Sequence, residues 1–219
     1  MDIFREKEWN GMTDYTIITV GRQFGSGGHE IANRLAERLD IPLYDRNLIS
    51  MAAHELSLSY EEVENVDETI LGKFLSGYVV NTGSYTVFMN GNEENIPLSD
   101  KVFRTQTAIM KKLAKRGSCI FVGRCADYIL GDYSNCINVF VKAYKDDRVR
   151  RIMKKYRLNE KDAWSEIKKI DRERKLYYEA HTGREWGSTD THEIVFNASL
   201  MGIEGVTDAL EGIYRKWEK

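Results

Sequence analysis

Short apolar runs alternate along this chain with stretches in which apolar residues recur every three or four positions. The short runs are rich in β-branched and aromatic residues, as buried strands are, and cover residues 15–20, 41–45, 119–123, 137–143 and 193–197. Helical periodicity covers residues 28–40, 102–115, 145–156, 160–178 and 203–217. Continuous apolar strands that alternate with helices are typical of a parallel sheet covered on both faces, so the pattern predicts an α/β fold.

The alternation stops between residues 52 and 99. This interval has a helix-like stretch at residues 60–75, β-prone residues at 85–89 and an Asn90-Gly91 turn signal. We therefore predict a single domain over residues 1–219 with an inserted subdomain at residues 52–99. In such folds ligands bind at the carboxyl ends of the strands.

Composition and charge exclude several classes of protein. The chain has 219 residues, as expected for one domain, and its net charge of −2 recruits neither nucleic acid nor an anionic membrane. The charged N-terminal residues and the lack of a long apolar run lead us to expect a cytoplasmic protein. Three cysteines without a C-x-x-C pair and four scattered histidines predict no metal site built by the protein alone.

A glycine-rich segment, VGRQFGSGGHEIA at residues 20–32, joins the first predicted strand to the first predicted helix. Glycines there let backbone N–H groups converge at a helix N-terminus, an arrangement that holds phosphate; the alternative is a turn that only packs strand against helix. The full P-loop pattern is G-x-x-x-x-G-K-[ST]. Here Arg22 takes the first glycine's place, Gly28 stands at the lysine position and His29 at the Ser/Thr position, and Ser26 is the nearest hydroxyl.

The positions of several arginines are a second indication of phosphate binding. Arg124 follows the strand at residues 119–123 and would lie at the same sheet edge as the loop, where it could grip a phosphate. Arg104 and Gln106 lie on the helix before that strand. Further arginines gather after the fourth strand and in the next helix: Arg148, Arg150, Arg151, Arg172 and Arg174. A polyphosphate would suit this density of positive charge, whereas ion pairs on solvated helix faces are the alternative.

Taken together, these features resemble the cytidylate kinase-like proteins, a branch of the P-loop nucleoside monophosphate kinases. The blocks that carry the resemblance span most of the chain, in family order: ITVGRQFGSGGHEIA, PLYDRNLI, FRTQTAIMKKLAKRGSCIFVGRCADYIL, KIDRERKLYYEAHTGREWG and VFNASLMGIEGV. Cytidylate kinases have G-R-D after strand three, and here the third position is Cys125.

The resemblance implies a five-stranded parallel sheet in the order 2-3-1-4-5, flanked by helices. It also implies a nucleoside monophosphate-binding subdomain at the insertion and a helical lid at residues 157–190. The implied reaction is transfer of the γ-phosphoryl of ATP, with magnesium, to CMP, dCMP or a similar small acceptor. The expected partner is the nucleotide substrate, and a homodimer stays open.

The expected roles of the candidate residues fall into three groups. Catalysis is assigned to Arg22, Arg124, Arg172 and Arg174. The donor nucleotide is assigned to Gly21, Gln23, Phe24, Gly25, Ser26, Gly27, Gly28, His29, Arg148 and Arg151. The acceptor is assigned to Asp45, Arg104, Gln106 and Asp171, where Asp45 has the alternative role of a helix N-cap.

The missing loop lysine leaves other functions open. The chain could bind nucleotide or phosphate without turnover, as a regulatory protein, or could phosphorylate another small molecule. Because phosphates that meet in a dry cleft need a cation, we predict that Arg22 substitutes for the lysine and points into the concavity of the loop. The alternative is a pair between Arg22 and a carboxylate outside the cleft. The HTGREWG segment at residues 181–187, with Trp186, is not explained by phosphate binding.

Overall fold

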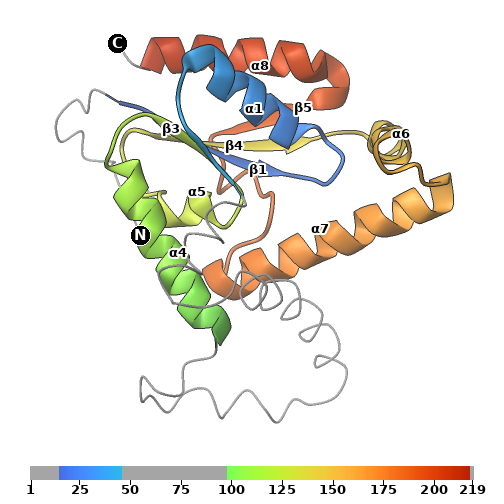
Figure 1. Cartoon of the computed structure of the whole chain (residues 1–219), viewed down its shortest axis with the longest axis horizontal. Helices are drawn as coiled ribbons and strands as arrows, with labels where there is room; N and C mark the ends of the chain where they lie inside the picture. Colours follow the sequence, from blue (N-terminus) through green and yellow to red (C-terminus); the bar gives the residue numbers. More distant parts are fainter. Residues whose placement is uncertain (1–14, 46–97, 218–219) are drawn as a thin grey trace. The chain divides into compact units, whose positions relative to one another are not determined.

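The computed structural model describes residues 15–45 and 98–217 of the chain (Figure 1). The chain divides into two compact units, one made of Met1–Asp45 and Ala114–Lys219, the other of Arg46–Leu113. In the second unit, the described element is α4 (Leu98–Ala114). The helix predicted at residues 60–75 and the hairpin at 85–89 lie outside the described residues.

The first unit is built on a five-stranded parallel sheet. Its strands are β1 (Ile17–Arg22), β2 (Leu43–Tyr44), β3 (Cys119–Val122), β4 (Cys136–Lys142) and β5 (Ile194–Asn197). They lie in the order β2-β3-β1-β4-β5, so the predicted fold and strand order are confirmed. In the central register, Val20 of β1 pairs with Val122 of β3 and Val139 of β4.

Helices cover both faces of this sheet (Figure 1). They are α1 (Gly28–Leu39), α5 (Ala126–Ile129), α6 (Lys145–Tyr156), α7 (Glu160–Thr182) and α8 (Ala198–Trp217). Helices α1 and α8 lie together on one face, and α5 and α7 lie on the other. Helix α6 follows β4 and packs against α7 through a small apolar cluster that includes Ile152 and Ile167.

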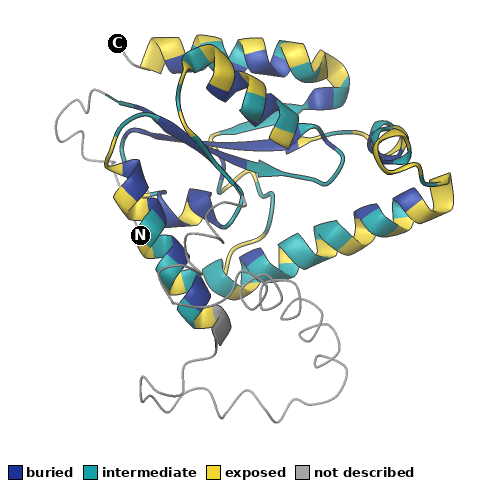
Figure 2. Ribbon diagram, viewed as in Figure 1, coloured by how far each residue is buried: buried dark blue, intermediate teal, exposed yellow. Residues whose placement is uncertain are grey.

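The apolar pattern explains the core. Each residue of β3 is buried, as is each residue of β4 except Lys142, because both strands carry helices on both faces (Figure 2). Helix α1 buries Ile31, Ala32, Leu35 and Ala36 against the sheet, with the spacing that the sequence shows.

Some element bounds differ from the predicted ones. Strand β1 continues to Arg22, so this arginine still belongs to the sheet when the loop begins. Helix α7 runs four residues beyond the predicted end at residue 178, to Thr182, and Gly183 ends it in the left-handed conformation at φ 65°. It fills most of the segment predicted as a lid. No helix in the described part of the chain is long and apolar enough to cross a membrane.

Candidate active site

The loop between β1 and α1 has the backbone shape of an anion site. Gly25 and Gly27 adopt φ values of 78° and 88°, which a side chain would strain, and Gly27 caps the N-terminus of α1. The buried Ser26 hydroxyl donates to the Gln23 carbonyl at 2.9 Å and accepts from the Gly28 N–H at 3.3 Å. The Ser26 hydroxyl therefore stabilises the turn. The positive end of the α1 helix dipole lies at this loop, as in known anion sites.

Two charged side chains, Asp171 of α7 and Arg148 of α6, form hydrogen bonds to the backbone of this loop. Asp171 of α7 accepts the Phe24 N–H at 2.7 Å, and the Arg148 Nε of α6 donates to the Phe24 carbonyl at 2.8 Å. Arg148 and Asp171 also pair with each other, and both are largely buried. Gln23 adds a bond in which its side-chain oxygen accepts the Ala143 N–H at 3.2 Å. Arg148, Asp171 and Gln23 thus hold the loop backbone in place.

Arg22 crosses the sheet edge from the loop to the end of β3. A Cβ atom at Gly28 would lie 2.7 Å from the Cβ of Arg22, and a Cβ atom at Gly123 would lie 1.8 Å from its Nη1. Burial lowers the pKa of the Arg22 guanidinium, the neighbouring positive charges of Arg174 and Arg124 lower it further, and Asp45 raises it. A guanidinium in such surroundings is stabilised by an added anion.

Arg124 stands in an unusual turn directly after β3. Gly123, Arg124 and Cys125 have φ values of 73°, 58° and 57°, so two residues with side chains adopt the left-handed conformation in succession. Each such residue costs on the order of 1 kcal/mol, which local packing must offset. The turn keeps Arg124 at the sheet edge, where its charge lowers the pKa of both Arg22 and Arg174.

Arg174 reaches the same place from α7. Its Nη1 donates to the backbone carbonyl of Arg22 at 3.1 Å, and its guanidinium lies 5.5 Å from the centroid of the Phe24 ring. Burial lowers its pKa, and Asp171 and Asp45 raise it. Arg22, Arg124 and Arg174, from three elements, form what we call the arginine cluster.

Asp45 is the carboxylate that faces this cluster. Its Oδ2 lies 2.6 Å from Nε2 of His29, in the first turn of α1, and His29 Nδ1 lies 3.1 Å from the Asn33 amide nitrogen. Burial raises the pKa of Asp45, but the hydrogen bond with His29 and the charges of Arg22 and Arg124 outweigh it, so the pKa lies below its ordinary value. Among the described residues, Asp45 and Asp171 therefore lie near four arginines, Arg22, Arg124, Arg148 and Arg174, which leaves an excess of positive charge.

A cavity of about 430 Å³ lies beside the loop. Gly25 and Ser26 line one side, and the first residues of α8 with Arg150, Arg151 and Lys154 of α6 line the rest. Arg151 also pairs with Glu30 at 2.9 Å. The volume lies within the usual range of small-molecule sites.

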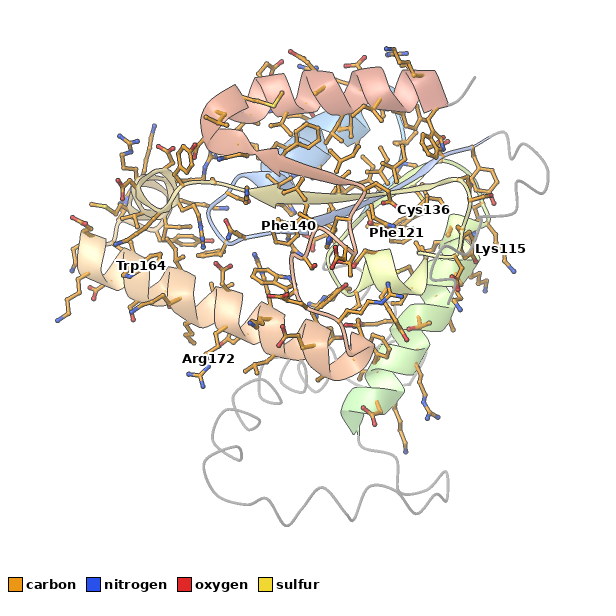
Figure 3. The ribbon with its side chains drawn as sticks, turned by 180° about the vertical axis from the view of Figure 1, so that it is seen from behind. Lys115, Phe121, Cys136, Phe140, Trp164 and Arg172 are labelled. Atoms are coloured by element: carbon orange, nitrogen blue, oxygen red, sulfur yellow. The ribbon has the colours of Figure 1, made fainter. Side chains whose placement is uncertain are left out.

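Several predicted site residues lie elsewhere. Arg172 is exposed and points away from the sheet, on the outer side of α7 (Figure 3). Gly21 lies within β1, where a Cβ atom would come 2.7 Å from the Phe140 ring, so its small size serves packing. Arg104 and Gln106 lie on α4, in the second unit, and their role toward the acceptor stays a prediction.

Trp186 of the HTGREWG segment packs against the aromatic ring of Phe140, and the segment itself is half-buried to exposed. Trp186 and His192 both pack edge-on against Phe140, with ring centroids 5.4 and 5.1 Å away. Close by, the Tyr178 hydroxyl of α7 donates to Asp127 of α5 at 2.6 Å, and His192 Nε2 lies 3.8 Å from the same carboxylate. Trp186 therefore has a packing role, and this role accounts for a residue that phosphate binding did not explain.

Several residues of the site were missed from the sequence alone, among them Gly123, Asn33 and, at the cavity, Lys154 and Ser199. The Arg22 guanidinium lies against Gly123, where a side chain would collide with it, and the Asn33 amide contacts His29. The signal for Gly123 was available in the G-R dipeptide after the third strand, since a glycine at a strand end permits close approach of another group. Asn33 gave no comparable signal, because only its helical spacing from His29 connects it to the site.

Comparisons with known proteins agree with this architecture. A family model described as the cytidylate kinase-like family matches residues 17–200. An uncharacterized protein from Eubacterium ventriosum has a similar solved structure, with a TM-score of 0.66, 28% identity, and coverage of 91% of this chain and 98% of that one. A gluconokinase from Sinorhizobium meliloti has a TM-score of 0.51 at 15% identity, over 93% and 94% of the two chains, and so shares the fold. No curated protein matches the sequence.

Proposed function

The chain belongs to the cytidylate kinase-like family, and on this premise we propose that it transfers the γ-phosphoryl of ATP to CMP, dCMP or a similar small phosphate-bearing acceptor. The observation that carries the proposal is the arginine cluster beside the loop at the N-terminus of α1. With Arg148, these arginines outnumber the two nearby carboxylates, Asp45 and Asp171, so the excess of positive charge favours an added anion.

The donor nucleotide has a place on the loop side of the cluster. Backbone N–H groups at the start of α1 would hold its phosphates, since helix N-termini with glycine-rich loops bind such groups. The cavity beside the loop would take the nucleoside, with Arg150 and Arg151 at its wall. Arg148 and Asp171 act on the loop backbone and would keep it in the binding conformation.

The acceptor phosphate would lie against Arg124 at the end of β3. Phosphoryl transfer brings two negatively charged groups together, so catalysis consists mostly of positioning and charge neutralisation. Arg174, which comes from the lid helix α7, would add its charge when the lid closes over both phosphates. Asp45 would orient the acceptor by accepting a hydrogen bond, while His29 fixes the carboxylate.

Magnesium would come with ATP. Among the described residues, no group of three His, Cys, Asp or Glu side chains could hold an ion. Magnesium on a nucleotide needs only one or two carboxylates beside phosphate oxygens and water, a demand that Asp45 suits. When bound, it would neutralise charge on the donor phosphates.

A second candidate function is nucleotide binding without turnover. Two observations favour it. Position 28 has no side chain to follow the transferred group, and the Ser26 hydroxyl, the nearest hydroxyl to the missing Ser/Thr, is engaged within the loop. A protein of this kind would act as a sensor or regulatory partner.

An ADP-release assay separates the two candidates. The wild-type chain would be given MgATP with CMP, dCMP, UMP, AMP or, as a hydroxyl acceptor, gluconate, and ATP binding would be measured in parallel by calorimetry. We expect turnover with a pyrimidine monophosphate. Binding of ATP without turnover on any acceptor would favour the regulatory function, and turnover on gluconate alone would replace the nucleotide as acceptor.

A further inference from the structure

We propose that Arg22 carries the function of the missing P-loop lysine, and that Gly28 and Gly123 are glycines because the Arg22 side chain lies over both. The inference rests on the proposed function and deepens it, because it assigns the cation that accompanies the transferred phosphoryl. It involves one residue from each of three segments: β1, the first turn of α1 and the turn after β3.

The first step concerns the position of the lysine itself. In a P-loop the lysine stands at the start of the helix and reaches the β- and γ-phosphates. Here a Cβ atom at position 28 would lie 2.7 Å from the Arg22 Cβ, 3.2 Å from the Val141 Cβ and 3.3 Å from the Arg22 Cγ, so Arg22 is the tightest of its neighbours. A side chain at position 28 and the arginine at position 22 therefore compete for the same space, and the chain keeps the arginine.

The second step concerns the charged end of Arg22. A Cβ atom at Gly123 would lie 1.8 Å from Nη1 of Arg22 and 3.0 Å from its Cζ. Any side chain at position 123 would displace the guanidinium. The cation therefore lies between the loop and the turn that carries Arg124, which is where donor and acceptor phosphates would meet.

The third step concerns charge. Among the described residues, no carboxylate oxygen lies within ion-pair distance of the Arg22 guanidinium, and its buried Nε has no hydrogen-bond partner. Arg174 and Arg124 repel the guanidinium, and the more distant Asp45 attracts it and compensates only part of that charge. Burial of a guanidinium with this little compensation lowers the stability of the fold, and a bound anion would offset that loss. We therefore infer that the Arg22 charge serves to bind an anionic ligand.

A side-chain exchange tests the inference. Arg22→Ala should lower kcat by about 10²- to 10³-fold, the typical loss when one group that stabilises transition-state charge is removed. The double variant Arg22→Gly with Gly28→Lys should recover at least about tenfold of that loss, since lysine would then enter the space that Arg22 left. Arg215→Ala, an exposed arginine that pairs with Glu211 on α8, controls for a change in net charge.

Binding measurements keep the test independent of turnover. By calorimetry, Arg22→Ala should weaken ATP far more than AMP, because the guanidinium would touch the terminal phosphates alone. Circular dichroism would show that each variant is folded. Wild-type kcat and ATP affinity in Arg22→Ala would overturn the inference, as would a damaged Arg22→Ala that the exchange does not rescue. A wild type that binds ATP without turnover fails the proposed kinase function, and the ATP–AMP comparison still decides the role of Arg22.

Discussion

The C-terminal half of helix α7 contacts the rest of its unit at two places with different chemistry. At its charged end, toward the loop, Asp171 and Arg174 bond to backbone groups of Phe24 and Arg22, in a region where positive charge is in excess. At its paired end, one turn further along, the Tyr178 hydroxyl donates to Asp127 of α5, close to Phe140, Trp186 and His192. The charged end has room for an added anion, whereas at the paired end the Tyr178 hydroxyl and the Asp127 carboxylate satisfy each other.

The difference separates function from stability within one helix. Like charges held together destabilise a fold unless a ligand compensates them, so the charged end is kept at a cost that binding recovers. At the paired end, the hydrogen bond between Tyr178 and Asp127 offsets the cost of burying these polar groups and holds α7 against α5. We therefore expect substitutions at the charged end to affect turnover and substitutions at the paired end to affect folding.

The largest effect is expected from Arg174→Ala. Removing one charge-stabilising donor should lower kcat by about 10²- to 10³-fold. Without ligand, the melting temperature should change little. Burial of the Arg174 guanidinium and its repulsion by Arg124 and Arg148 oppose folding, whereas Asp171, Asp45 and the bond to the Arg22 carbonyl favour it. Steady-state kinetics and ligand-free thermal melts on the same preparation measure both quantities. A strong loss of stability with unchanged kcat would contradict the assignment of the charged end of α7 to turnover and the paired end to folding.

Addition of phosphate or sulfate should stabilise the wild type. An anion at 100 times its dissociation constant adds about 2.7 kcal/mol to the free energy of unfolding, or about 2–4 °C per kcal/mol for a domain of this size. The shift should shrink in Arg174→Ala and persist in Tyr178→Phe. Sodium chloride at equal ionic strength is the control. Equal shifts with chloride would mean that general screening, and no anion site, is responsible.

A smaller effect is expected at the paired end. Tyr178→Phe deletes the hydroxyl that donates to Asp127 and leaves a buried carboxylate with one partner fewer, which costs about 1–3 kcal/mol. Chemical denaturation should show this loss, while kcat well below the melting temperature stays within about threefold, since the hydroxyl lies outside the arginine cluster. A double-mutant cycle with Asp127→Asn would assign the energy to this contact.

The same contrast explains what the sequence could predict. The parallel α/β architecture and the loop position follow from local signals, since apolar runs and glycine spacing lie in contiguous residues, whereas the strand order came from the family resemblance. The arginine cluster depends on segments far apart in the chain. Arg22 and Gly123 meet only after β1 and β3 pair, and no single-segment pattern shows that Arg148 and Asp171 support the loop backbone.

Arg172 is a different case, because the relevant signal was present. Asp171, Arg174 and Tyr178 follow the i, i+3, i+7 spacing of one helix face, and an arginine at position 172 falls away from that face. Its charge and the match of its segment to the lid segment of the resembling family suggested a catalytic role for Arg172, and helical geometry would have argued against it. Residue chemistry nominates a site residue, but the face of its element decides whether it reaches the site.

The smallest expected effect concerns the thiols of the core. Cys119, Cys125 and Cys136 are buried, and burial raises the pKa of Cys119 to about 12. Since the thiolate is the reactive form, the native protein at pH 8 should react with a disulfide reagent such as dithiobisnitrobenzoate at well under one thiol per chain, and the unfolded protein at all three. Because the folded state keeps a proton on Cys119 that the unfolded state loses above about pH 8.5, stability should decline as the pH rises from there toward 12. Tyr178→Phe should speed the reaction by loosening the paired end, whereas Arg174→Ala should not; equal acceleration in both variants would show that the two ends of α7 open together and would remove the distinction between them.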